Sequence, residues 1–341
     1  MTATQSTVQP LIAHKPSDYR QETTLANRLI KLALIVALGT VLAACTRQES
    51  LRVGIHPWIG YEPLYLARDL GWLPDHVQLR EATNANTLLH QLEEGEIDAA
   101  TLTLDELLVA RSRNIPVSAV LVFDVSAGGD AIVARKGIDS VVQLPGKLIA
   151  VESSAVGMLV LTKALASVGL TLADVSIKNL PPDRQLQAWQ HNGIDAVVTY
   201  EPTATQLQHN GAVRIFDTRQ LPDTIFDVLA VRTDHLQPTL LRALIRAHFR
   251  ALEHLRTNRQ DALFRIAAHQ HVSLPELQNI IGGITMPNLE GNQQYLNEAG
   301  PLQKATGELS RFMLDHHLLT RSVNLRGTVT SAFLPAEGSG E

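Results

Sequence analysis

The chain has 341 residues, of which 45% are hydrophobic and 18% charged, and its formal net charge is −5 at pH 7. This composition is typical of a globular protein with enough apolar residues for one large domain or two medium ones. The mildly acidic balance, without a basic run, excludes nucleic acid as an expected partner. Cys45 is the one cysteine, so no internal disulfide can form.

The first distinctive segment is NRLIKLALIVALGTVLAAC, which ends at Cys45. Arg28 and Lys31 flank the start of an apolar run over 32–44. This run is shorter than the roughly 20 residues that a membrane-spanning helix needs. A positive start, an apolar middle and small residues before the end are typical of a secretory signal.

The ending Leu-Ala-Ala-Cys resembles the lipobox of bacterial lipoproteins. The resemblance implies cleavage before Cys45 and acylation of this residue; a plain signal peptide and a core helix are the alternatives. We expect a signal peptide over 1–44, a lipidated linker over 45–50, and a mature protein anchored by lipid to a membrane, facing the periplasm or cell exterior.

Large side chains occupy the turn in RVGIHPWIGYEPLYLARDLGWL. Val53 and Ile55 alternate with other residues and predict a short strand, and Pro63 marks the start of a helix. Trp58 and Tyr61 stand between them, where turn chemistry favours glycine, serine or asparagine. They indicate a surface that contacts a ligand; the alternative is that they only cover the strand ends.

From residue 51 onward, short strands alternate with helices, which predicts α/β units with largely parallel sheets. We expect strands over 77–82, 97–103, 117–124, 147–153, 175–180, 194–200, 213–217 and 227–232. Helices are expected over 87–95, 105–114, 154–169 and 184–193. After residue 236 the pattern becomes helical and includes a capping box from Ser273 to Glu276. The tail over 326–341 has no clear period and is expected to be loose.

Two passages of the chain repeat one another. QLEEGEIDAATLTLDE and AWQHNGIDAVVTYEP both run from a helix through glycine and Ile-Asp-Ala to an apolar strand and an acidic residue. The repeat predicts two small α/β lobes. Because open α/β sheets bind ligands outside the carboxyl ends of their strands, two facing lobes would form a binding cleft.

Three longer passages resemble the substrate-binding proteins of ABC importers, in the branch for nitrate, sulfonates, taurine and the thiamine pyrimidine precursor. They are YEPLYLARDLGWL, LPGKLIAVESSAVGMLVLTKALASVGL and NLPPDRQLQAWQHNGIDAVVTYEP. The resemblance covers about 50–235 well and the later helices loosely. It implies an α/β, two-lobed type II periplasmic-binding-protein fold that closes over a small solute.

By this resemblance the first lobe comprises 51–125 and the helical return over 230–325, and the second lobe comprises 126–229. The residues that it implies for ligand binding follow predicted strands or begin helices: Trp58, Tyr61, Glu62, Asn84, Asn86, Thr103, Asp124, Ser126, Ser153, Ser154, Tyr200, Glu201 and Asp227. Helix capping is the alternative for one of the asparagines and for the two serines. Gly128 and Gly129 beside them indicate either a hinge or a simple turn.

The carboxylates near the strand ends argue against a simple anion site, because no arginine accompanies them and buried unpaired carboxylates would repel an anion. Aromatic and acidic side chains together favour an aminated planar ring or an amine as the solute, over a sulfonate or nitrate.

The function predicted is therefore capture of a small solute by a monomer, without a cofactor, and its delivery to an ABC permease. A sensor that reports to a membrane receptor would have the same lobes. An enzyme resembling those that make the thiamine pyrimidine is disfavoured, because its cysteine-rich segment is absent and no nucleophile, phosphate or zinc motif occurs. His269, His271, His316 and His317 are read as exposed polar residues and not as metal ligands.

Overall fold

The structure is a computed structural model that describes residues 2, 31, 50–152, 156–191 and 193–336. The segment from Ser50 onward forms a compact unit by itself. Cys45, Ser153 and Ser154, which the sequence singled out, lie outside the described residues. Among the residues described, no helix is both long enough and apolar enough to span a membrane.

Lobe 1 is built on a six-stranded sheet of order β11-β4-β10-β3-β1-β2. Its strands are β1 (Leu51–Ile55), β2 (Val77–Glu81), β3 (Ala99–Thr103), β4 (Val117–Ser126), β10 (Phe226–Arg232) and β11 (Ile284–Thr285). Strands β2, β1 and β3 are parallel, and β10 lies antiparallel between β3 and β4. Every residue of β3 and β4 is buried, as expected for central strands covered on both faces.

Lobe 2 repeats this plan in a five-stranded sheet of order β7-β6-β8-β5-β9. Its strands are β5 (Asp130–Ala134), β6 (Leu148–Val151), β7 (Ser176–Asn179), β8 (Ala196–Tyr200) and β9 (Val213–Asp217). Strands β7, β6 and β8 are parallel, and β5 lies antiparallel between β8 and β9. Each antiparallel strand is the first strand that the chain forms after it crosses from the other lobe: β5 follows β4 of lobe 1, and β10 follows β9 of lobe 2.

The Ile-Asp-Ala repeat has the same role in both lobes. Asp98 Oδ2, just before β3, accepts a hydrogen bond of 2.8 Å from the backbone N–H of Arg52 in β1. Asp195 Oδ2, just before β8, accepts one of 2.8 Å from the backbone N–H of Leu148 in β6. Each aspartate thus fixes the start of the parallel strand beside it, β1 in lobe 1 and β6 in lobe 2. This shared role explains the sequence repeat, and the predicted architecture in two halves is confirmed.

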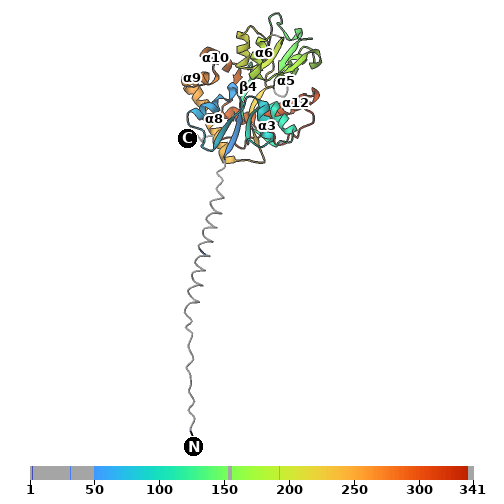
Figure 1. The fold of residues 1–341 in the computed structure, drawn as a ribbon. Helices are drawn as coiled ribbons and strands as arrows, with labels where there is room; N and C mark the ends of the chain where they lie inside the picture. Colours follow the sequence, from blue (N-terminus) through green and yellow to red (C-terminus); the bar gives the residue numbers. More distant parts are fainter. Residues whose placement is uncertain (1, 3–30, 32–49, 153–155, 192, 337–341) are drawn as a thin grey trace. The chain divides into compact units, whose positions relative to one another are not determined.

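Helices cover both sheets (Figure 1). The helices that follow strands of lobe 1 are α2 (Glu62–Asp69), α3 (Ala85–Glu93), α4 (Leu104–Ser112), α8 (Pro238–Thr257), α9 (Arg259–Gln270), α10 (Leu274–Ile281), α11 (Leu289–Tyr295) and α12 (Pro301–Asp315). Lobe 2 contributes α5 (Val156–Ala166), α6 (Pro182–Gln190) and α7 (Thr203–His209). Short 3-10 helices are η1 (Ile59–Tyr61), η2 (Val141–Gln143), η3 (Leu172–Asp174) and η4 (Thr218–Gln220).

The long helix α8 shows why the return segment packs on lobe 1. Its buried residues include Leu241, Leu244, His248, Ala251 and Leu255, which are three or four positions apart and therefore share one face. This face packs against the core of lobe 1, and α8 also contacts α2.

Two segments cross between the lobes, and hydrogen bonds join them. The hydroxyl groups of Ser126 and Thr218 lie 2.7 Å apart, and the backbone N–H of Gly128 donates to Thr218 Oγ1 at 2.8 Å. Gly128 has a φ of 123°, which side chains rarely adopt. The Ala-Gly-Gly-Asp segment is thus a tightly bonded crossing between β4 and β5.

The predicted alternation of strands and helices is confirmed, with three differences. Strand β5 and helix α7 were not expected, because a short apolar run behind two glycines was read as the crossing alone. The expected loose tail instead lies along β4: Ala119 N–H donates to Thr328 C=O at 2.7 Å, and Thr330 N–H donates to Ala119 C=O at 3.0 Å.

Candidate functional site

A small cavity of about 20 Å³ lies where strand ends of the two lobes meet. Lobe 1 lines it with His56, Trp58, Ala85, Thr103, Glu106 and Asp227, and lobe 2 with Asp130, Glu152, Val156 and Tyr200. A cavity of this size holds about one water molecule. Any larger solute therefore needs the lobes to move apart, at least for entry.

Three larger hollows lie on the surface of the described residues, with volumes of about 650, 670 and 630 Å³. The first is lined mainly by α4, α5 and the end of α12, and the second mainly by α8, β11 and α11. The third is lined mainly by the crossing segment and helices α7 and α10. The first two do not lie at the carboxyl ends of strands from both sheets, which is where α/β folds place ligands, and the third lacks the aromatic walls that Trp58 and Tyr200 give the small cavity. The interlobe cavity is therefore the candidate site despite its small volume.

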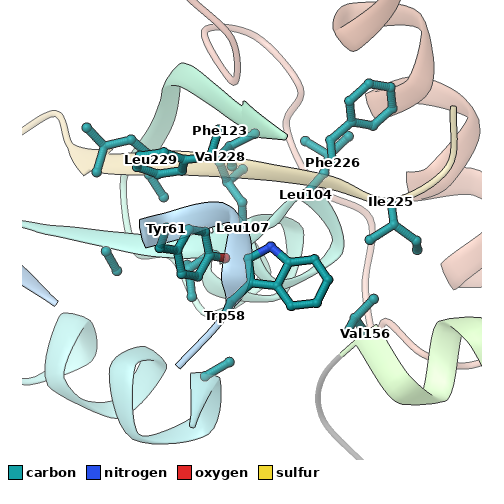
Figure 2. Close-up of a cluster of buried hydrophobic side chains, with 14 of the residues drawn as sticks. Trp58, Tyr61, Leu104, Leu107, Phe123, Val156, Ile225, Phe226, Val228 and Leu229 are labelled. Carbon is teal, nitrogen blue, oxygen red and sulfur yellow. The ribbon is translucent and has the colours of Figure 1, made fainter. Parts of the chain in front are cut away.

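Trp58 forms one wall of the cavity. Its Nε1–H donates to Asp124 Oδ2 at 2.9 Å, and its ring meets Tyr200 of lobe 2 edge to face, with the centroids 5.7 Å apart. A Cβ atom on Gly129 would come within 2.6 Å of the indole, so the missing side chain makes room for it. Figure 2 shows the indole among the buried side chains of both lobes, with Val156 at the start of α5.

Tyr61 supports the cavity from behind. It is fully buried in the hydrophobic cluster (Figure 2). Its ring packs edge to face against His56 and Phe123, and its hydroxyl donates to the carboxylate of Asp227. Burial and the charge of Asp227 both raise the pKa of the phenol, so Tyr61 remains a hydrogen-bond donor at neutral pH. Tyr61 thus holds Asp227 in place and is part of the core.

Buried carboxyl groups dominate the electrostatics of the site. Burial raises the pKa of Asp130 and of Glu152 to about 7, and that of Asp124 to about 8. Burial, and then repulsion from neighbouring acids, raises the pKa of Glu106 and of Asp227 well above the usual range. Several of these groups therefore hold protons near pH 7 unless a cation compensates their charge.

Side-chain contacts join the lobes beside the cavity. Asn86 Nδ2 of α3 donates to Glu152 Oε1 of lobe 2 at 2.5 Å. A second contact between the lobes lies outside the cavity lining: Lys163 Nζ of α5 is 4.3 Å from the ring centroid of Phe312 in α12. These contacts break when the lobes separate, so they contribute to the preference for the closed arrangement.

The structure brings four of the predicted site residues to the cavity itself: Trp58, Thr103, Tyr200 and Asp227. Tyr61 and Asp124 lie directly behind it, bonded to Asp227 and Trp58 respectively. Asn86 acts through Glu152.

Four others have structural partners elsewhere. Asn84 caps α3 by accepting from Thr87 N–H at 3.0 Å, which is the alternative weighed for it. Ser126 joins the crossing segments. Glu62 accepts from His269 Nδ1 at 2.7 Å, and Glu201 pairs with Arg214. The expectation that no arginine accompanies these acids is thus wrong for Glu201, because Arg214 reaches it from β9.

Four polar residues of the cavity were not in the predicted set of ligand-binding residues: His56, Glu106, Asp130 and Glu152. His56 was nevertheless recognised as the start of the loop that carries Trp58 and Tyr61. Glu106 was visible as the acidic end of the internal repeat, and Glu152 as an acid following a strand. Asp130 gave no such signal, because strand β5, which it begins, was not recognised.

No group of three or more potential ligand side chains in the described part of the chain is placed to hold a metal ion. His269 pairs with Glu62, and the ring of His316 packs on that of Phe312, with centroids 4.2 Å apart. Both histidines thus have contacts within the protein.

The fold and the cavity between its lobes define a two-lobed binding protein of the periplasmic type. Residues 45–269, more than half of the chain, match the model of the NMT1-like family, and the chain belongs to this family. It is 25% identical, over 70% of its length and 77% of the relative's, to the taurine-binding periplasmic protein of Escherichia coli strain K12.

Solved structures agree with this fold. The alkanesulfonate-binding protein of Xanthomonas axonopodis pv. citri, bound to MOPS, superposes with a TM-score of 0.70 at 16% identity, covering 84% of this chain and 99% of that one. The periplasmic aliphatic sulphonate binding protein of Escherichia coli gives a TM-score of 0.69 at 17% identity, covering 82% and 92%. The predicted family, fold class and class of solute-binding protein are confirmed.

Proposed function

We propose that this chain is the extracytoplasmic solute-binding component of an ABC importer, that it is anchored by lipid at Cys45, and that it works as a monomer without catalysis. The observation that carries the proposal is the interlobe cavity, to which both lobes contribute aromatic and carboxyl side chains. A site shared by two lobes can open to admit a solute and close around it.

The relatives support this role. The protein with 25% identity is a periplasmic taurine-binding protein, and the two structural neighbours bind sulfonates. A role in import explains why the site is small and enclosed. The importer can then recognise the closed, loaded form by the relative position of the two lobes.

The first test is chemical. The full chain is purified in mild detergent from its native host, unfolded, and the released small molecules are identified by mass spectrometry. We expect one compound in near-equimolar amount from the wild type and little from Tyr200→Ala. Phe264→Ala, which removes an aromatic ring that is 68% exposed and outside the cavity, is the matched control and should retain the compound.

The second test is biological. Cells without the gene should lose uptake of the released compound, and the wild-type gene should restore it. Release of no compound from the wild type would overturn solute binding. A released compound whose uptake does not depend on the gene would overturn import and favour the role of a sensor.

A further inference from the structure

The cavity is acidic and lacks a fixed positive charge. Its carboxyl groups come from both lobes: Glu106, Asp130, Glu152 and Asp227. Among the described residues that line it, none is lysine or arginine, and the one basic side chain is His56. Burial lowers the pKa of His56 to about 4, so the imidazole is neutral near pH 7.

Asp130 has an unused acceptor in this cavity. Glu106 accepts from Thr103 N–H, Glu152 from Asn86 and Asp227 from Tyr61. Asp130 is only 4% exposed, and its Oδ2 has no hydrogen-bond partner among the residues described. Both ring nitrogens of His56 and Thr103 Oγ1, which also line the cavity, lack a partner among these residues as well, so a solute here also meets free donors. A buried polar atom without a partner is costly, and the oxygens of an ionised carboxylate only accept, so the missing partner of ionised Asp130 is a donor.

The arginines nearest to the site are used elsewhere. Arg214 pairs with Glu201, and Arg219 pairs with Asp217 at 2.5 Å. Neither lines the cavity. A sulfonate or nitrate held here would meet several buried carboxyl groups and no guanidinium in the cavity lining, because Arg214, whose charge lowers the pKa of Asp130, is bonded to Glu201.

The aromatic walls complete the pattern. The rings of Trp58 and Tyr200 meet at the cavity with centroids 5.7 Å apart. Aromatic faces attract cations, and the attraction is stronger where water is excluded. The free space of about 20 Å³ matches one ammonium head group, and the carbon chain of an amine needs the lobes to stand further apart than they do here.

We propose that the cavity binds the ammonium group of a small organic amine, with Asp130 as the direct acceptor and Trp58 and Tyr200 as its aromatic walls. This inference rests on the proposed function, since it names the solute class of the same site. It predicts a solute specificity different from that of a protein that binds nitrate or sulfonates without an amino group.

The test is calorimetric titration of the purified full chain with probes of similar size and different charge: ethylamine, 2-aminoethanol, taurine, ethanesulfonate and nitrate. We expect ethylamine and 2-aminoethanol to bind, and ethanesulfonate and nitrate to give no binding heat. Asp130→Asn keeps the shape of the side chain and should weaken amine binding at least tenfold. The matched control Asp139→Asn, at an exposed position, should bind amines as the wild type does.

Tyr200→Leu is the second variant, in case Asp130→Asn fails to fold. It leaves every carboxyl group in place and should also weaken amine binding at least tenfold. The proposal is overturned if ethylamine and 2-aminoethanol do not bind. This includes the case in which taurine binds and these two amines do not, because taurine binding would then require its sulfonate. Binding of sulfonates or nitrate alone would overturn the amine proposal and leave the proposed function intact. The proposed function is overturned by different results: no compound is released from the wild type, or uptake of the released compound does not depend on the gene.

Discussion

The indole of Trp58 contributes both to the cavity and to the stability of lobe 1. The sequence places it on a strand-to-helix loop, which led us to expect a side chain at a wet cleft with little buried area. In the structure it is 3% exposed, because the second lobe covers it and Asp124 accepts its N–H. Removing it must therefore affect folding as well as binding.

Trp58→Phe tests this hydrogen bond by keeping an aromatic ring and removing the donor. We expect the free energy of unfolding to fall by about 1–3 kcal/mol, because Asp124 is left as a buried acceptor without a donor. Urea denaturation of Trp58→Phe, Asp124→Ala and the double variant forms a double-mutant cycle, because each single change removes one partner of the bond. A coupling of about 0.5–3 kcal/mol is expected; strictly additive losses would show that the bond contributes nothing.

Individual residues also show where sequence reasoning ends. Trp58 and Tyr200 both line the interlobe cavity, and the sequence indicated this by their positions just after or at the end of a strand, which is a local signal. The partner of Glu201 was not visible, because Arg214 is 13 residues away on β9, and only the pairing of β5 with both β8 and β9 brings it close. Long-range pairing of polar side chains needs the register of the sheet.

Helix α9 is joined to α2 by an ion pair between the partly exposed His269 and the buried Glu62, and this pair makes stability depend on pH. Its hydrogen bond to Glu62 raises the pKa of His269 above its usual value. Because the folded-state pKa is raised, the stabilisation is fully present below the ordinary histidine pKa of about 6.5 and is lost as the pH rises through the folded-state pKa.

His269→Gln should remove this pH dependence. We expect thermal melting at pH 5.5 to occur at a lower temperature than in the wild type, by an amount that corresponds to roughly 0.5–1 kcal/mol since the imidazole is partly exposed. The difference should shrink by pH 8.5. His271→Asn, exposed at the end of the same helix, is the control and should leave the pH profile unchanged. A constant difference across this range would contradict the account.

Helix α3 presents an equally direct test of lobe closure. Asn86→Asp places a second carboxylate against Glu152, so it should weaken the closed arrangement at pH 8, where both groups ionise. Asn84→Asp adds the same charge two residues earlier and preserves the helix cap, so it should not. Limited proteolysis of the crossing segment over 126–130 measures the difference. Equal cleavage of the two variants would show that the contact does not hold the lobes.

At the scale of elements, most of the fold was predictable because each strand and helix carries its own apolar period. The pairing of the lobes was indicated by the Ile-Asp-Ala repeat, whose two aspartates bond equivalent strands. Strand β5 was missed because its run of five residues directly follows Gly128 and Gly129, and these glycines indicated a crossing segment and not the start of a strand.

We propose that the whole protein works while a lipid on Cys45 anchors it to a membrane. Cys45→Ser should leave an unprocessed or soluble form, because the thiol that would carry the lipid is gone. Membrane fractionation and intact-mass measurement of wild type and variant check this. An unchanged membrane fraction and mass in the variant would contradict the lipid anchor without affecting the solute site.

The central claim is that a solute closes the two lobes over the interlobe cavity. The most direct measurement is the distance between spin labels on Gln78→Cys of lobe 1 and Lys178→Cys of lobe 2, both exposed, in a Cys45→Ser background. Adding the compound released from the native protein should shorten and narrow the distance distribution, and Tyr200→Ala should abolish this change. An unchanged distribution, with calorimetry showing the compound bound, would contradict the account.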